Sequence, residues 1–153
     1  MRDGHIFQAV FPLPDLAATA VLGARIAGHL RPGDIVALSG ELGAGKTTLA
    51  RAILTGLGVA ETVPSPTFTL VQAYQTEKLT ISHFDLYRLK DPREMDELGL
   101  EEALETGAAL IEWPERAGER LAGDRLMVEL SIHDDGRRAA LSGPEGWREL
   151  FHG

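Results

Sequence analysis

The nine residues GELGAGKTT, from Gly40 to Thr48, constrain the fold of this chain more than any other segment. They follow the short apolar run Ile-Val-Ala-Leu that begins at Ile35, and apolar residues recur at helical spacing from Leu49 onward. A short apolar run suits a buried strand of a parallel sheet, and the later spacing suits a helix. The glycines therefore predict a tight loop that joins a buried strand to a helix.

Each part of this loop has a physical task at a phosphate group. Glycines let backbone amides curl around phosphate oxygens, Lys46 offers a positive charge, and the Thr47 hydroxyl can ligate Mg²⁺. A glycine-rich turn with only a structural role would require neither side chain. The segment is therefore a P-loop, which predicts binding of a nucleoside triphosphate with Mg²⁺. We expect nucleotide contacts at Gly40, Glu41, Leu42, Gly43, Ala44, Gly45, Lys46, Thr47 and Thr48.

Two carboxylates end apolar runs elsewhere in the chain. Asp85 follows the run Leu79 to Phe84, and Glu112 follows Ala108 to Ile111. Ligands of open α/β sheets bind beyond the carboxyl ends of the strands, so we expect both carboxylates near the P-loop. A P-loop hydrolase needs one group for the metal and one to position the attacking water. Taken without the P-loop, either residue could equally be a helix cap or a surface residue.

Strands and helices alternate along the rest of the chain. Apolar patterns predict a strand from residue 5 to 13, a helix to residue 30, strands over 68–74 and 79–84, a helical acidic region over 91–105, and a hairpin around Asp134-Asp135-Gly136. This order predicts an α/β, P-loop NTPase-like three-layer fold with a mixed, largely parallel central sheet and a C-terminal β-hairpin. We expect residues 1–153 to form one domain.

Composition limits the cellular compartment and the classes of binding partner that we expect for this chain. The chain has no cysteine, and its apolar segments are interrupted well short of a membrane span, so we expect a cytoplasmic protein that does not contact a membrane. A formal net charge of -8 opposes direct binding to nucleic acid, which normally needs clustered Lys and Arg. No lysine lies in the Asn/Thr-Lys-x-Asp element that guanine specificity requires, which favours adenine.

Four motifs together resemble the TsaE (YjeE) family, the small ATPases of bacterial tRNA threonylcarbamoyladenosine synthesis. They are GELGAGKTT at the P-loop, SPTFTLV from Ser65 to Val71, HFDLYRL from His83 to Leu89, and IEWPE from Ile111 to Glu115. They occur in family order over most of the chain. The resemblance implies a Mg²⁺-dependent ATPase that acts with TsaB and TsaD, which install threonylcarbamoyl on an adenosine beside the tRNA anticodon. It also implies that the chain meets tRNA only through those partners.

The same resemblance implies catalytic and metal-binding roles. Lys46, Asp85 and Thr67 would be catalytic, with Asp85 acting in catalysis or positioning water, and Thr67 sensing the γ-phosphate as a switch-like residue. Thr47 and Glu112 would ligate Mg²⁺, with Asp85 as the further candidate ligand. Which of the two carboxylates ligates the metal and which positions water stays open at this stage.

Nucleotide contacts outside the P-loop are also implied by the resemblance. Trp113 would lie beside the nucleotide, Thr19 would form part of an adenine pocket, and Arg137 would contact the nucleotide or its phosphates. Residue type alone leaves plainer roles open: Trp113 as a core residue and Arg137 as a solvated arginine at a hairpin tip. His83 could carry a proton beside Asp85, but its place in a strand favours a packed or hydrogen-bonded histidine.

Three classes of function stay open. They are an ATPase subunit of a tRNA-modifying complex, a small-molecule kinase, and a nucleotide-gated binding module with negligible turnover. The ATPase is favoured over a kinase, because a kinase would ordinarily carry a substrate-binding insertion and an arginine-bearing lid. We expect this ATPase to be slow alone and to depend on its partners. The acidic run that includes Glu101, Glu102 and Glu105 could dock a basic partner surface, although such runs are usually a solvated face.

Overall fold

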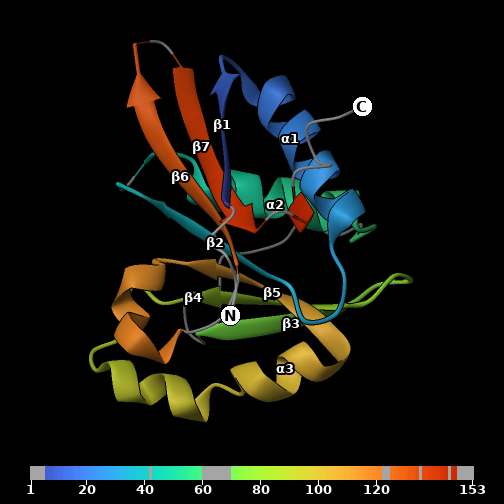
Figure 1. Cartoon of the computed structure of the whole chain (residues 1–153), viewed down its shortest axis with the longest axis vertical. Coiled ribbons are helices and arrows are strands. Elements are labelled where there is room, and N and C mark those ends of the chain that lie inside the picture. Colours follow the sequence, from blue (N-terminus) through green and yellow to red (C-terminus); the bar gives the residue numbers. More distant parts are fainter. Residues whose placement is uncertain are drawn as a thin grey trace.

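Figure 1 shows a computed structural model of the chain, which describes residues 6–41, 43–59, 70–121, 125–134, 136–144 and 146–147. Within these residues the strands are β1 (Ile6–Leu13), β2 (Ile35–Gly40), β3 (Val71–Gln75), β4 (Thr80–Asp85), β5 (Gly107–Glu112), β6 (Leu126–His133) and β7 (Gly136–Pro144). The helices are α1 (Leu16–His29), α2 (Lys46–Gly56) and α3 (Leu100–Thr106), and the 3-10 helices are η1 (Pro92–Glu97) and η2 (Pro114–Arg120).

The strands form a seven-stranded sheet in the order β1-β7-β6-β2-β5-β4-β3. Its middle is parallel, because β2 pairs with both β5 and β6, and β5 pairs with β4. Its edges are antiparallel hairpins, β3 with β4 on one side and β6 with β7 on the other, and β1 extends the second edge beside β7. The mixed α/β fold with a largely parallel centre and a C-terminal hairpin is therefore confirmed.

Helices cover both faces of the central strands and produce three layers. On one face α1 and α2 pack against strand residues such as Leu38 and Leu110, and on the other η1, η2 and α3 pack against residues such as Phe84 and Ile111. Figure 1 shows α1 and α3 on opposite sides of the sheet. Since successive residues of a strand face opposite layers, Leu110 and Glu112 both face the α2 layer. That face carries the site described below.

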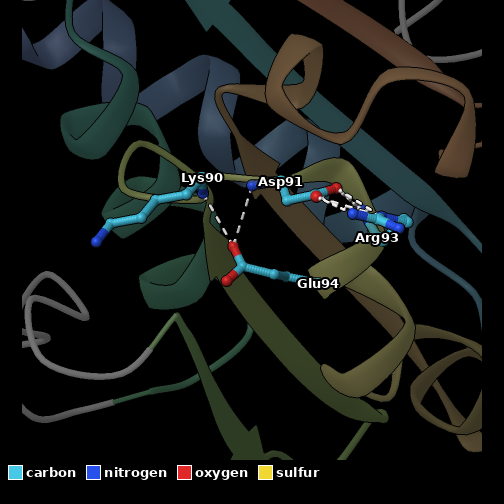
Figure 2. A network of polar contacts seen from close by, with 4 residues as sticks. All are labelled: Lys90, Asp91, Arg93 and Glu94. Atoms are coloured by element: carbon cyan, nitrogen blue, oxygen red, sulfur yellow. Dashed lines mark hydrogen bonds and ion pairs between the residues drawn. The ribbon is translucent and has the colours of Figure 1, made fainter.

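The helical acidic region over 91–105 is two separate elements, η1 and α3, rather than one helix. Gly99 separates them with a left-handed backbone (φ 79°), which ends a right-handed helix. Figure 2 shows the start of η1, where the Asp91 carboxylate accepts from the Arg93 backbone N–H at 2.9 Å and Glu94 Oε1 accepts from the Asp91 N–H at 3.2 Å. These two acids form a capping box, so they serve the local turn.

Helix α1 begins where the sequence predicts it. The Asp15 side chain caps the helix by accepting from the Ala18 backbone N–H at 2.9 Å. At the other end of α1, Lys78 from the β3–β4 turn donates to the carbonyls of Ala27 and Gly28, each at 2.9 Å. Among the described residues, no helix has the length and apolar character needed to cross a membrane.

Candidate nucleotide-binding site

The P-loop connects the end of β2 to the start of α2 and has a backbone that only glycines adopt easily. Gly40, Gly43 and Gly45 have positive φ values of 137°, 86° and 105°. A Cβ at Gly40 would also lie 2.4 Å from the carbonyl oxygen of Leu130 in β6, so the loop could not approach this strand with a larger residue. The first turn of α2 starts without a side-chain cap, as expected where backbone amides are to meet an anion.

Lys46, the first residue of α2, turns its side chain back into the loop. It is only 5% exposed, and its Nζ donates to the carbonyl of Gly40 and, at 3.0 Å, to that of Glu41. Nζ also lies 4.0 Å from the ring centroid of Trp113, a distance typical of a cation–π contact. Burial lowers the pKa of the Lys46 ammonium, and nearby carboxylates, Glu112 foremost, oppose that shift. The loop therefore holds a buried positive charge at its mouth.

The two predicted carboxylates lie side by side next to α2. Asp85 and Glu112 are register partners at the ends of the parallel strands β4 and β5. Glu112 is 2% exposed, and its Oε1 accepts a hydrogen bond from Thr47 Oγ1 at 3.0 Å. The structure thus brings together the hydroxyl and the two carboxylates that the sequence assigned to the metal.

These three oxygen-bearing side chains fit a magnesium ion bound with a triphosphate. Mg²⁺ prefers oxygen ligands in octahedral geometry and is usually held by one or two carboxylates together with substrate phosphates. Thr47 and Glu112 already share a hydrogen bond, so the hydroxyl oxygen and the carboxylate are close enough for both to hold one cation in place of that bond. Asp85 is the next donor along the same edge. The donor set agrees with the group that the P-loop implies.

Asp85 differs from Glu112 in its environment. One of its oxygens, Oδ1, accepts the Tyr87 backbone N–H at 3.1 Å. Burial raises the pKa of the Asp85 carboxyl above its ordinary value, and the neighbouring Glu112 raises it further, while the Tyr87 N–H, His83 and Lys46 act in the opposite direction. A carboxylate with a raised pKa is a better proton acceptor, which suits a group that handles the proton of an attacking water.

A cavity of about 330 Å³ opens over these groups and has aromatic walls. Trp113 and Tyr87 stand with ring centroids 4.9 Å apart. Trp113 has a left-handed backbone (φ 60°), which is unusual for a bulky residue and occurs most often at functional sites. The cavity is lined by Gly43, Gly45, Lys46, Thr47, Thr48, Asp85, Tyr87, Glu112 and Trp113. Trp113 is therefore a wall of this cavity and also packs against the apolar cluster that η1, η2 and α3 cover.

A second cavity, of about 250 Å³, lies on the other side of the P-loop. Thr19 of α1 and Arg137 of β7 both line it, and so do the apolar residues Leu13, Pro14 and Leu16. The Nε of Arg137 donates to the carbonyl of Gly43 at 3.2 Å. The hairpin arginine therefore contacts the P-loop, and the structure brings Thr19 and Arg137 to one pocket although they are 118 positions apart in the sequence.

His83 has a partner that the sequence did not predict. Its side chain is fully buried and hydrogen-bonded, as its place in a strand indicated, and the partner is Glu112, whose Oε2 lies 2.6 Å from the His83 Nε2. The sequence signal that could have placed His83 at the site was its position two residues before Asp85, because residues two apart in a strand share a face. Of the predicted site residues, Leu42 and Thr67 lie outside the described part of the chain.

These features define a P-loop nucleotide-binding protein of the α/β class. A glycine loop follows a buried parallel strand, a buried lysine lies in the loop, and two carboxylates end the adjacent strands. A family model described as "Threonylcarbamoyl adenosine biosynthesis protein TsaE" matches residues 13–140. The chain belongs to this TsaE family, as its motifs indicated.

Individual relatives agree with this membership. Two proteins named "tRNA threonylcarbamoyladenosine biosynthesis protein TsaE" match over 121 residues. The one from Rickettsia felis is 46% identical, and the match covers 78% of this chain and 71% of that protein. The one from Bacillus subtilis is 37% identical, and the match covers 78% of this chain and 75% of that protein. Among solved structures, the crystal structure of Bacillus subtilis YdiB superposes with a TM-score of 0.81 at 28% identity, covering 97% of this chain and 94% of that one. The shared fold therefore extends over nearly the whole chain.

Proposed function

We propose that this chain is a Mg²⁺-dependent ATPase that works in tRNA threonylcarbamoyladenosine biosynthesis. Membership of the TsaE family gives the pathway. The observation that supports hydrolysis is the arrangement of Thr47, Glu112 and Asp85 beside the buried ammonium of Lys46. A simple phosphate-binding loop would need no paired carboxylates, whereas hydrolysis needs both a metal ligand and a group that orients water.

Each side chain has a separate task in this proposal. The P-loop amides and Lys46 would hold the phosphates, and Thr47 and Glu112 would hold Mg²⁺, which would supply positive charge to the triphosphate. Asp85 orients a water and takes its proton while the water oxygen bonds to the γ-phosphorus and the bond to the β–γ bridging oxygen breaks. The raised pKa of the Asp85 carboxyl supports this role, because it favours the proton-bound form.

The second cavity is the proposed adenine pocket. Its apolar wall, formed by Leu13, Pro14 and Leu16, suits the face of a purine, and Thr19 adds a polar group. Arg137 stands at the junction of this pocket and the P-loop, since it both lines the cavity and donates to Gly43. This position supports a contact to the nucleotide at Arg137.

The proposed partners are homologues of TsaB and TsaD, through which the chain would meet tRNA. The net charge of -8 supports this indirect contact, because a protein that grips tRNA itself would need clustered positive charge. Glu101 and Glu102 are exposed in the first turn of α3 and stay available to a partner, unlike the acids of the η1 capping box.

Single-turnover hydrolysis, measured alone and with TsaB and TsaD added, tests this function. We expect slow release of inorganic phosphate from ATP by the chain alone and faster release with the partners. Transfer of the phosphate to a small acceptor would identify a kinase instead. Binding of ATP with no phosphate release in either condition would identify a nucleotide-gated binding module.

Lys46→Ala gives the sharpest test of the phosphate site. We expect it to abolish ATP binding and turnover and to keep the fold, because the Lys46 ammonium contacts loop carbonyls and the Trp113 ring rather than the apolar core. Lys90→Ala controls for the loss of a lysine charge elsewhere, since Lys90 is exposed and lies before η1. The measurements are ATP affinity by calorimetry and circular dichroism for the fold. Undiminished hydrolysis by the Lys46 variant would refute the assignment.

A further inference from the structure

His83 is a buried polar residue with a defined partner in the middle of the sheet. It lies in β4, its side chain is 1% exposed, and its Nε2 is 2.6 Å from Oε2 of Glu112. The other ring nitrogen, Nδ1, has no hydrogen-bond partner among the described residues. Within that part of the chain, Glu112 is therefore the group that orients the imidazole through a hydrogen bond.

The pairing follows from the register of two parallel strands. His83 lies opposite Leu110, and Asp85 lies opposite Glu112. Since residues two apart on a strand share a face, His83 and Glu112 are diagonal neighbours on the face that carries α2. The backbone, and not a chance side-chain conformation, brings the imidazole within reach of the carboxylate.

The two oxygens of Glu112 have different partners. Oε1 accepts from Thr47 Oγ1 at 3.0 Å, and Oε2 pairs with His83 Nε2. A metal-binding carboxylate is ionised and can only accept hydrogen bonds, so Nε2 must carry the hydrogen and donate it. A rotation of the carboxylate would break a short charge-assisted hydrogen bond inside the protein, which is costly.

We propose that His83 is a positioning residue that holds Glu112 by Oε2 and so keeps Oε1 directed at Thr47, where it ligates the magnesium ion of the bound nucleotide. This rests on the proposed function, in which Thr47 and Glu112 hold that ion. Hydrogen bonds to metal-ligating side chains fix the orientation of the ligand, and their loss weakens metal binding. His83 itself touches neither metal nor nucleotide in this role.

The test compares His83→Phe, which fills the buried space without a donor, with His83→Gln, which keeps an N–H donor. Mn²⁺ binding to the complex with a non-hydrolysable ATP analogue is measured by electron paramagnetic resonance, and nucleotide affinity is measured separately in EDTA. We expect His83→Phe to weaken Mn²⁺ binding by about 10- to 100-fold. Its nucleotide affinity in EDTA should stay unchanged, and His83→Gln should recover most of the Mn²⁺ affinity.

Ser82→Ala is the matched control. Ser82 is a buried polar residue of the same strand, 5% exposed, but its side chain faces the opposite layer and so lies away from Glu112. It should leave Mn²⁺ binding unchanged. Circular dichroism and thermal unfolding show whether each variant is folded, and His83→Met replaces His83→Phe in the comparison if the latter does not fold.

Glu112→Gln separates failure of this inference from failure of the proposed function. If Glu112→Gln weakens Mn²⁺ binding but folded His83→Phe does not, the positioning role is refuted and the metal site stands. Equal losses in His83→Phe and His83→Gln would also refute the role, because donor chemistry would then not matter. If Glu112→Gln leaves Mn²⁺ binding unchanged, the metal site itself is wrong and the role of His83 is refuted with it.

Discussion

Asp85 and Glu112 show how two neighbouring acids acquire different properties. They are register partners, yet Glu112 has hydrogen bonds from Thr47 and His83, whereas Asp85 receives one from the Tyr87 backbone. The pKa of Asp85 is raised chiefly by burial. A carboxyl whose pKa is raised by folding lowers the stability of the folded protein once the pH exceeds its ordinary pKa.

Asp85→Asn should therefore stabilise the metal-free protein at neutral pH. The raised pKa means that the folded state binds more protons than the unfolded state between the two pKa values, so stability falls as pH rises through that range. Asparagine keeps an acceptor for the Tyr87 N–H and removes the titration. We expect a higher unfolding temperature than that of the natural chain in EDTA, with the difference shrinking as pH falls toward the ordinary value of 3.8.

Differential scanning calorimetry over a pH series checks this expectation. The variant should also hydrolyse ATP far more slowly, because it lacks the proposed proton acceptor. An unfolding temperature equal to that of the natural chain at every pH would contradict the stability argument, whatever the activity.

At the scale of elements, the contact between α1 and α2 sets the position of the P-loop. A Cβ at Gly23 of α1 would lie 2.4 Å from the Cβ of Ala52 and 2.9 Å from the backbone nitrogen of Ile53. At Gly56 of α2, a Cβ would lie 2.9 Å from the Cβ of Ala27. The helices therefore approach closely at these two neighbouring positions. Because α2 begins in the P-loop, their spacing bears on the phosphate site.

Gly23→Ala should force these helices apart. We expect a loss of about 1–3 kcal/mol in the free energy of unfolding, as is typical of overpacking. Gly28→Ala is the control on the same helix: nothing lies within 4 Å of a Cβ there, so removal of a flexible residue should be neutral or add about 0.5 kcal/mol. Urea denaturation measures both variants. Equal stabilities would show that the helices adapt without cost.

For the whole molecule, the charge balance determines which partners it can meet directly. Against 23 acidic residues the chain has 15 Lys and Arg, and Lys46 is buried in the P-loop. A polyanion such as tRNA is bound mainly through Lys and Arg contacts to phosphates. A chain with a net charge of -8 is, on balance, repelled by tRNA.

The isolated chain should therefore not retain tRNA at physiological salt. With TsaB and TsaD present, we expect it to migrate with tRNA in a gel-shift experiment, because the partners would supply the positive surface. Lowering the salt tests for a weak electrostatic contact by the chain alone. If the isolated chain retains tRNA, and added salt weakens this retention, the chain binds tRNA directly and the proposed contact through partners is contradicted.

Local patterns in the sequence predicted much of the fold and the elements of the site. The P-loop, the helix after it and the buried strands depend on residues close in sequence, and Asp85 and Glu112 could be assigned to strand ends in the same way. The division of the acidic region at Gly99 was missed, because a single glycine within a helical pattern does not by itself end a helix.

What the sequence determined by itself was the chemistry of the phosphate loop, because loop, strand and helix are contiguous there. The tertiary structure decided which distant groups complete it. The order β2-β5-β4 and the register between β5 and β4 place His83 against Glu112, and the contact of the β6–β7 hairpin with the P-loop brings Arg137 to the pocket of Thr19. Strand order and register depend on pairing between segments far apart in the chain, which no local periodicity encodes.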